Sequence, residues 1–245
     1  MPTPSSPSPA ASPAQLEELG RRAALLIGDG QRVGLGSGRA ALAFVRQLGQ
    51  RIRAEKLNVI GVATSLATEQ VARDSGIPLS TLRDTPELDI AIDGADEVDP
   101  QLNLTKGGGG HLTREKVIAS CARRLVIVVG QEKIVEHLGE HFPVFVEVIE
   151  FARPAVVRKL EALGGAVTQR MNADGSPFLT DNQNPYLHCR FGRPPHHLAD
   201  PEKLELTLDE IPGLVETGLF FHMADEVLIA NADGTIAHRK RQIQA

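Results

Sequence analysis

Residues 32–48 read RVGLGSGRAALAFVRQL, and this stretch decides the fold class. Its first four residues predict a short strand, and residues 40–48 carry apolar side chains at helical spacing. The glycines between the two segments mark a tight turn, because glycine enters turn conformations without steric cost. A strand, a glycine-rich turn and a helix in this order are typical of a parallel sheet covered by helices. The stretch therefore predicts an α/β protein.

The same alternation extends in both directions along the chain. Residues 16–27 predict a helix before the first strand. Further strands are predicted at 58–63, 88–92 and 125–129, and further helices at 66–76 and 112–122. The run at 125–129 is the most apolar, as expected for a strand buried on both faces. We expect these segments to form a Rossmann-like, doubly wound sheet.

The rhythm changes at Phe142-Pro143, where shorter segments begin. A strand at 144–148, a helix at 154–163 and turn-rich strands through 190 predict a small α+β lid inserted into the larger domain. A last apolar strand at 226–230 is expected to return to the main sheet. The predicted boundaries are a catalytic domain over 14–141, a lid over 142–217 and the return over 218–245.

Residues 1–13 read MPTPSSPSPAASP, which is rich in proline and serine and has no apolar core. Such a segment is neither a signal peptide nor a membrane anchor, and we interpret it as a disordered tail. Its removal is expected to leave activity and melting temperature unchanged. No other segment approaches the roughly 20 apolar residues that a membrane span requires.

Composition narrows the classes of ligand. The 245 residues carry a formal net charge of −5, with one tyrosine and no tryptophan. A nucleic-acid surface needs positive charge and base-stacking aromatic side chains, so this class is disfavoured, and an anionic ligand would need a local pocket. Cys121 and Cys189 form no paired motif, which suits packing roles in a reducing cytoplasm. A small phosphorylated substrate fits these constraints.

Gly34-Leu-Gly-Ser-Gly38 lies between a predicted strand and helix, where backbone N–H groups at a helix N-terminus can hold a phosphate. Dinucleotide binding requires GxGxxG and an acidic residue after the second strand. Here the spacing is GxGxG and the second strand ends in Ala63-Thr-Ser65. The pattern favours a monophosphate site, with a ligand-free tight turn as the alternative.

Two further motifs carry charge. Asp93-Gly-Ala-Asp-Glu97 follows a predicted parallel strand, where open α/β sheets bind ligands, and crowded carboxylates there favour a raised pKa and proton transfer. Solvated capping of a turn is the alternative. Lys106 precedes four consecutive glycines, whose N–H groups could stabilise an oxyanion. Glu115 falls in the first turns of the next helix, where the helix dipole alone would also favour an acid.

His137-Leu-Gly-Glu-His141 matches the inverted zinc-protease pattern HxxEH. Gly139 and the adjacent Phe142-Pro143 argue against the long helix that such a metal site requires. We therefore expect no metal there.

Taken together, these motifs resemble those of the A-type ribose-5-phosphate isomerases from about residue 16 onward. The matching stretches are GLGSG at 34–38, DGADEVDP at 93–100, KGGGGHLTREK at 106–116, GQEK at 130–133, TDN at 180–182 and IPGLVETGLF at 211–220. The resemblance implies a Rossmann-like domain with a ferredoxin-like lid, a homodimer or homotetramer, and catalysis without a metal or organic cofactor. It implies interconversion of ribose 5-phosphate and ribulose 5-phosphate, a step of the non-oxidative pentose phosphate pathway.

The resemblance also implies roles for individual residues. Glu115 would be the general base that moves a proton between C1 and C2 through a cis-enediol. Asp93 and Asp96 would exchange protons with substrate hydroxyls. The enediolate would be stabilised by Lys106, Lys133 and the amides of Gly107, Gly108 and Gly109. The phosphate would lie at Ser37, Gly38, Arg39 and Ala40, and Gly94 and Ala95 would line the substrate pocket.

The chain departs from the family pattern at three places. The usual GTGST is GSGRA here, so Arg39 and Ala40 replace two hydroxyl residues, and Arg39 could supply a bidentate phosphate contact. The usual DNGN is Asp181-Asn-Gln-Asn184, which loses a glycine and leaves the geometry of that turn open. His188 stands where an acid is frequent.

Two other functions are compatible with such a fold. A non-catalytic sugar-phosphate sensor would carry a DNA-binding helix-turn-helix, and 13 residues ahead of the first helix cannot hold one. Another enzyme of the same fold, such as an amino-sugar phosphate deaminase or a CoA transferase, could also use Glu115. The combination of Asp93, Asp96 and the Lys106 glycine run favours the isomerase.

Overall fold

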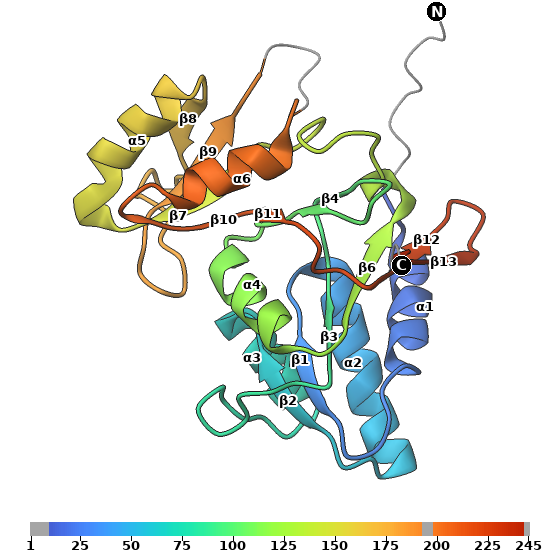
Figure 1. Cartoon of the computed structure of the whole chain (residues 1–245). Helices are drawn as coiled ribbons and strands as arrows, with labels where there is room; N and C mark the ends of the chain where they lie inside the picture. Colours follow the sequence, from blue (N-terminus) through green and yellow to red (C-terminus); the bar gives the residue numbers. More distant parts are fainter. Residues whose placement is uncertain (1–9, 193–197, 243–245) are drawn as a thin grey trace, which may run out of the picture.

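The computed structural model describes residues 10–192 and 198–242. Figure 1 shows a larger domain built on a central sheet and a smaller lid beside one end of it. The central sheet has six strands in the order β13-β12-β6-β3-β1-β2, of which only β13 is antiparallel to its neighbour. Its strands are β1 (Arg32–Leu35), β2 (Ile60–Ala63), β3 (Ile90–Asp93), β6 (Leu125–Gly130), β12 (Glu226–Ala230) and β13 (Ile236–Lys240). The predicted Rossmann-like sheet is confirmed.

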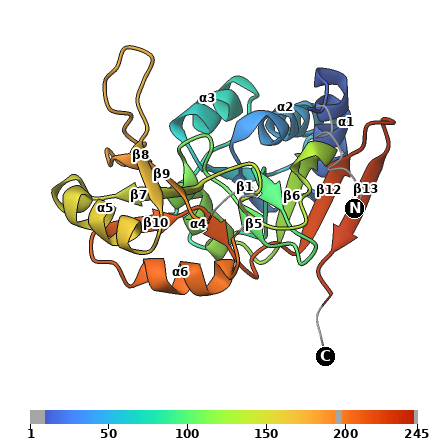
Figure 2. The ribbon, with the colours of Figure 1, turned by 90° about the horizontal axis from the view of Figure 1, so that it is seen from above.

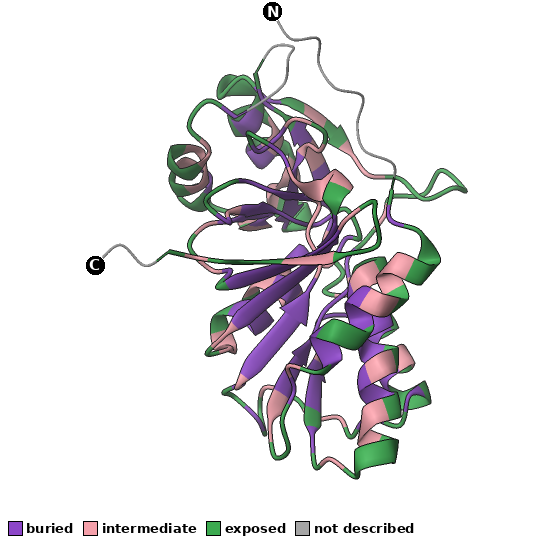
Figure 3. Ribbon diagram, turned by 90° about the vertical axis from the view of Figure 1, so that its right-hand side faces the viewer, coloured by how far each residue is buried: buried purple, intermediate pink, exposed green. Residues whose placement is uncertain are grey.

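Helices cover both faces of this sheet, as Figure 1 shows. On one face lie α1 (Pro13–Ala24), α2 (Gly38–Glu55) and α3 (Leu66–Asp74). The other face is covered by α4 (Leu112–Cys121) and by a small sheet of β4 (Glu97–Val98), β5 (Leu104–Thr105) and β11 (Leu219–Phe220). Both faces of the parallel strands are therefore buried, which explains their continuous apolar sequences (Figure 3).

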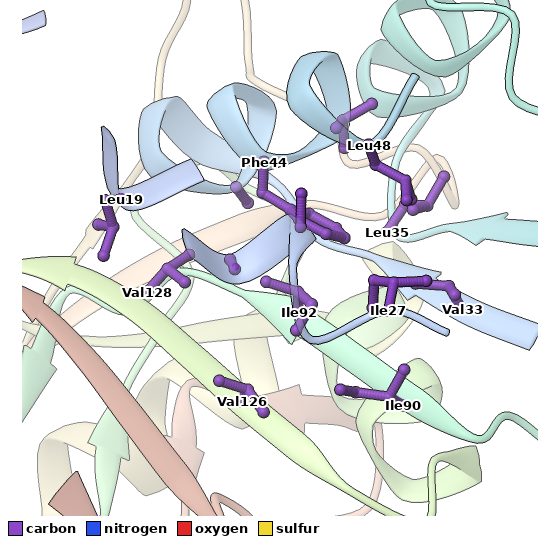
Figure 4. Packing of buried hydrophobic residues seen from close by; sticks show 14 of the residues in the cluster. Leu19, Ile27, Val33, Leu35, Phe44, Leu48, Ile90, Ile92, Val126 and Val128 are labelled. Atoms are coloured by element: carbon purple, nitrogen blue, oxygen red, sulfur yellow. The ribbon is translucent and has the colours of Figure 1, made fainter. Parts of the chain in front are cut away.

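The core under α2 shows why residues 32–48 decide the fold. Phe44 and Leu48 of α2 pack in one cluster with Leu35 of β1, and Figure 4 shows this packing. A Cβ atom on Gly34 would approach the Ala91 Cβ to 2.7 Å, so β1 can lie close to β3 only with glycine there. The turn that follows brings the first residues of α2 to the carboxyl end of the sheet.

The lid is an antiparallel sheet with two helices (Figure 2). Its elements follow the order β7 (Val144–Val148), α5 (Arg153–Ala162), β8 (Ala166–Gln169), β9 (Tyr186–Arg190), α6 (Pro201–Asp209) and β10 (Leu214–Thr217). The strand order β10-β7-β9-β8 and this βαββαβ succession give the expected ferredoxin-like arrangement. Short 3-10 turns, η1 (Gln131–Lys133) and η2 (Glu150–Ala152), precede and follow β7.

The N-terminal boundary differs from the prediction. Residues 1–9 of the predicted tail lie outside the described residues, but α1 begins at Pro13. Ser12 caps this helix in a capping box with Gln15, and Ala11 is buried. The helix cap at Ser12 argues against the expectation that removing residues 1–13 leaves activity and melting temperature unchanged, which stays a prediction to be tested.

Several short elements were absent from the sequence prediction. These are β13, α6, β10 and the two-residue strands β4, β5 and β11. A two-residue strand has no measurable periodicity, so only tertiary pairing reveals it. Among the described residues, no helix is long and apolar enough to cross a membrane.

Candidate active site

A cavity of about 210 Å³ lies at the carboxyl ends of β1, β3 and β6. This is the edge where open parallel sheets bind ligands. The residues that line it come from α1, the α2 turn, the segments after β3 and β5, α4, the end of β6 and η1: Leu16, Ser37, Gly38, Arg39, Ala40, Gly94, Ala95, Asp96, Lys106, Gly107, Gly108, Gly109, Glu115, Val128, Val129, Gly130, Glu132 and Lys133. Every predicted site residue except Asp93 is among them.

The N-terminus of α2 forms one end of the cavity. Gly38 adopts a φ of 83°, and Ser37 at the N-cap makes no side-chain cap hydrogen bond. The first N–H groups of this 18-residue helix, at Gly38, Arg39 and Ala40, therefore point beyond the helix end without acceptors from the helix itself. Together with the helix dipole they form an anion site of the kind that holds a phosphate.

The Ser37 hydroxyl is already committed to protein groups. Its Oγ lies 2.7 Å from the Thr64 Oγ1 and 3.2 Å from the Ser65 Oγ, and its N–H donates to the Asp93 Oδ1 at 2.9 Å. Ser37 thus fixes the turn to the ends of β2 and β3. Thr64 and Ser65, which follow the strand predicted at 58–63, therefore help to hold this turn, a structural role that the sequence did not reveal.

Lys106 stands at the centre of a buried group of charges. Its Nζ lies 3.1 Å from the Asp93 Oδ2 and 3.3 Å from the Glu115 Oε2, and it donates to the Gly94 carbonyl at 2.5 Å. All three charged side chains are almost fully buried. Burial alone would lower the pKa of Lys106, but the nearby Asp93 and Glu115 carboxylates outweigh it, and its pKa is raised. Lys106 therefore stays charged.

Glu115 is a buried carboxylate whose pKa is raised by its surroundings. It projects from the first turns of α4 into the cavity, 6% exposed, and its Oε2 has no hydrogen-bond partner besides the ion pair with Lys106. Burial raises its pKa to about 8, against the opposing effect of the Lys106 charge. A carboxylate with such a pKa is suited to proton transfer near neutral pH.

Asp96 and the glycine loop form the opposite wall. The Asp96 Oδ2 accepts the Gly108 N–H at 2.7 Å, and burial raises the pKa of Asp96. A Cβ on Gly108 would approach the Asp96 Oδ1 to 2.8 Å. Gly107 and Gly109 line the cavity, and their N–H groups have no protein acceptor in the described part of the chain. These N–H groups are available to an oxyanion.

Comparisons with known proteins agree with this geometry. The family described as ribose 5-phosphate isomerase A (phosphoriboisomerase A) matches residues 60–234. The chain is 46% identical to ribose-5-phosphate isomerase A of Roseiflexus sp. (strain RS-1) over 211 residues, 86% of this chain and 89% of the relative. The chain belongs to the ribose 5-phosphate isomerase A family.

Solved structures of isomerases in this family superpose on most of the chain. The Methanocaldococcus jannaschii enzyme gives a TM-score of 0.86 at 40% identity, covering 93% of this chain and 98% of that one. A D-ribose-5-phosphate isomerase in complex with phospho-erythronic acid gives 0.87 at 33% identity, with the same coverages of 93% and 98%. The chain is therefore an isomerase, which removes the sensor, deaminase and CoA transferase alternatives.

Asp93 is the one predicted site residue of this isomerase that does not line the cavity. Its Oδ1 accepts the N–H groups of Ser37 and Gly94, and its Oδ2 faces Lys106. A Cβ on Gly36 would come within 2.3 Å of the Asp93 Oδ1, so the second glycine of the turn makes room for this carboxylate. Asp93 lies behind the cavity wall and joins the phosphate turn to Lys106.

The turn at 180–184 forms without the glycine of the family pattern. Gln183 adopts a φ of 64°, the left-handed conformation that a glycine would accept more easily. The buried Glu147 of β7 accepts hydrogen bonds from Thr180, Asn182 and Asn184, and these bonds hold the turn. The same carboxylate accepts the Thr113 hydroxyl at 2.6 Å, which ties the lid to α4 beside Glu115.

The HxxEH segment does not form a metal site of the zinc-protease kind. Gly139 has a φ of 88° and no helix spans 137–141. The N–H groups of Gly139 and His141 instead donate to the buried carboxylate of Glu97, each at 2.6 Å. Across the described residues, the single group of acids close enough to hold a metal ion is Glu205, Asp209 and Glu216, and none of these lines the cavity.

Proposed function

We propose that this isomerase converts ribose 5-phosphate to ribulose 5-phosphate by moving a proton from C2 to C1 through a cis-enediol, with Glu115 as the base. One observation carries the proposal: the buried carboxylate of Glu115 is paired with Lys106 at a cavity that Gly107 and Gly109 also line, and the N–H groups of these glycines have no acceptor among the described residues. A carboxylate is a weak base for a C–H bond, so the anion formed must be strongly stabilised.

Each step follows from the groups around the cavity. Glu115 accepts the C2 proton of the open-chain aldose, and the electron pair moves onto the C1 oxygen. Lys106 and the Gly107 and Gly109 amides stabilise this enediolate. Protonated Glu115 then returns the proton to C1, and the C2 hydroxyl passes its proton to the C1 oxyanion, which leaves a ketone at C2 and a hydroxyl at C1. The same residue serves as base and then as acid, so no metal or organic cofactor is needed.

The two aspartates have different parts in this proposal. Asp96 lines the cavity and has a raised pKa, which suits proton exchange with a substrate hydroxyl during ring opening. Asp93 is buried behind Lys106 and holds its ammonium group in place. The predicted direct contact of Asp93 with substrate hydroxyls is thus replaced by a contact through Lys106.

The phosphate is proposed to bind at the N-terminus of α2. Gly38, Arg39 and Ala40 line the cavity there, and Arg39 is exposed and can swing onto the phosphate. Lys133 lines the same cavity, with its Nζ 4.4 Å from the centre of the Phe142 ring, and adds a second positive charge. The relative bound to phospho-erythronic acid supports a phosphorylated sugar acid as a ligand of this site.

We also propose a homodimer or homotetramer that works in the cytoplasm. Phe151 on the lid is 96% exposed, and Ile149, two residues before it, and Val215 of the neighbouring strand β10 are also exposed, so apolar side chains are available for self-association. Both described cysteines are free thiols, which suits a reducing compartment.

The test is turnover by the purified, EDTA-treated protein. It should convert ribose 5-phosphate to ribulose 5-phosphate, and should not convert unphosphorylated ribose at comparable rates, because ribose cannot use the α2 site. Arg39→Ala should raise KM several-fold if Arg39 binds phosphate. A well-folded protein that does not convert ribose 5-phosphate would refute the function, and an unchanged KM would refute the role of Arg39.

A further inference from the structure

The glycine loop after Lys106 is held from behind by side chains of the lid. The phenol of Tyr186, at the start of β9, donates to the Gly107 carbonyl at 2.5 Å. The guanidinium of Arg170, just after β8, donates to the Gly108 carbonyl at 3.3 Å. Two successive carbonyls of the loop that faces the reaction thus accept hydrogen bonds from the lid.

The aromatic neighbours fix both donors. Tyr186 is fully buried, and its ring centre lies 5.9 Å from that of Phe145 and 5.8 Å from that of Phe178. The Arg170 guanidinium lies 3.9 Å from the centre of the Phe178 ring. Stacking on an aromatic ring holds an arginine in a defined orientation, so the half-buried Arg170 is held against the loop.

These contacts also explain the glycines. A Cβ on Gly107 would lie 2.4 Å from the Tyr186 Oη, and a Cβ on Gly110 would lie 2.5 Å from the Phe178 ring. Both glycines have positive φ, 117° and 89°. The lid therefore packs directly against the loop backbone, and any side chain at these two positions would push it away.

The chemistry of the peptide group connects these contacts to the reaction. A donor on a carbonyl oxygen polarises the peptide and strengthens the next N–H as a donor. The Gly107 carbonyl shares its peptide with the Gly108 N–H, which holds Asp96 at 2.7 Å. The Gly108 carbonyl shares its peptide with the N–H of Gly109, a cavity-lining residue, and this N–H has no acceptor among residues 10–192 and 198–242. Burial raises the pKa of Tyr186 well above its usual value, so the phenol keeps its proton.

We propose that Tyr186 and Arg170 are positioning residues for the isomerase reaction, which set the place and the donor strength of the Gly109 amide and of Asp96. The inference rests on the proposed enediol mechanism. It assigns the lid a part in stabilising the intermediate. Neither residue touches the substrate in this account.

The test compares Tyr186→Phe and Arg170→Gln with wild type. Each variant should lower kcat on the order of tenfold, less than the 100-fold or more that loss of a direct oxyanion donor costs. KM for ribose 5-phosphate should stay within about twofold, because the phosphate site at α2 is unchanged. Inhibition by phospho-erythronic acid, whose planar carboxylate resembles the enediolate, should weaken by nearly the same factor as kcat.

Arg153→Gln is the matched control, because Arg153 is also an arginine of the lid. Its guanidinium donates to the side chains of Gln169, next to Arg170, and of Glu150, and among the described residues it makes no hydrogen bond to the glycine loop. Its kcat should equal that of wild type. If Tyr186→Phe does not fold, Arg170→Gln carries the test, since Arg170 is only half-buried.

The possible outcomes distinguish a failure of the positioning role from a failure of the proposed function. Folded variants with the kcat of wild type would overturn the positioning role alone. So would folded variants whose kcat and KM change while their inhibition by phospho-erythronic acid stays the same. A wild type without turnover would overturn the proposed function and this inference with it.

Discussion

At the scale of single residues, the site depends on charge that is costly to bury. Glu115 has a folded-state pKa of about 8, well above the ordinary value of 4.5. Between these two values the folded protein binds more protons than the unfolded chain, so this group makes the free energy of unfolding fall as pH rises. The buried Glu115 therefore lowers the stability of the fold in the pH range in which it ionises and can act as the base.

Glu115→Gln should therefore stabilise the fold at pH 8. One pKa unit corresponds to about 1.4 kcal/mol, and loss of the Lys106 ion pair offsets part of the gain. We expect the melting temperature to rise by about 2–4 °C at pH 8 and to be nearly unchanged at pH 5, where Glu115 is protonated anyway. Calorimetry at both pH values measures this, and an equal change at both would contradict the raised pKa.

The pH dependence of catalysis should report the same group. Only ionised Glu115 can accept the C2 proton, so kcat/KM of the free enzyme should rise about tenfold per pH unit below about 8 and then level off. The second ionisation of a phosphate ester, near about 6, lies below this range. A profile that is flat from pH 6.5 to 8.5 would mean that Glu115 is already ionised in the free enzyme.

At the scale of elements, the turn at 180–184 carries a strain that can be removed. Gln183 has a φ of 64°, where a non-glycine residue costs about 1 kcal/mol, and its side chain is exposed. Gln183→Gly restores the family pattern and should raise stability by up to about 1 kcal/mol, less the extra entropy of glycine in the unfolded chain. Chemical denaturation measures the change. A loss of more than about 1 kcal/mol would show that the Gln183 side chain stabilises the turn.

The cap of α1 gives a second prediction at this scale. Ser12→Ala removes the hydroxyl that accepts the Gln15 N–H and should cost about 1 kcal/mol of stability. Because Leu16 of the same helix lines the cavity, removal of residues 1–13 should also weaken substrate binding, whereas Ser12→Thr should be close to neutral. A truncated protein with the melting temperature and KM of wild type would show that the capping box contributes nothing.

At the scale of the whole molecule, the sequence predicts well what depends on local pattern. Strands such as 125–129 and the glycine turn at 34–38 have a period or composition that indicates their structure. The contacts of Tyr186 and Arg170 with the glycine loop join residues 79 and 62 positions apart, and no local pattern encodes them. The buried position of Asp93 was missed for the same reason, since it depends on the approach of β1 to β3.

The exposed apolar side chains of Ile149, Phe151 and Val215 predict self-association. Light scattering should give a mass of two or four chains for wild type, and Phe151→Asp should shift it toward a smaller species, because a charge cannot be buried in an apolar interface without a partner. A monomeric wild type would contradict the proposed oligomer. Activity retained in the smaller species would show that each cavity is complete within one chain.

The most direct test of the central claim is the turnover of ribose 5-phosphate by Glu115→Gln beside Glu205→Gln. Glu205 also pairs with a lysine, the half-buried Lys116, at 2.6 Å, but lies outside the cavity. In Glu115→Gln, kcat should fall by several orders of magnitude, with the fold and phospho-erythronic acid binding retained. In Glu205→Gln, kcat should stay at the wild-type value. A folded Glu115→Gln that turns over at a rate near wild type would contradict the claim that Glu115 is the base.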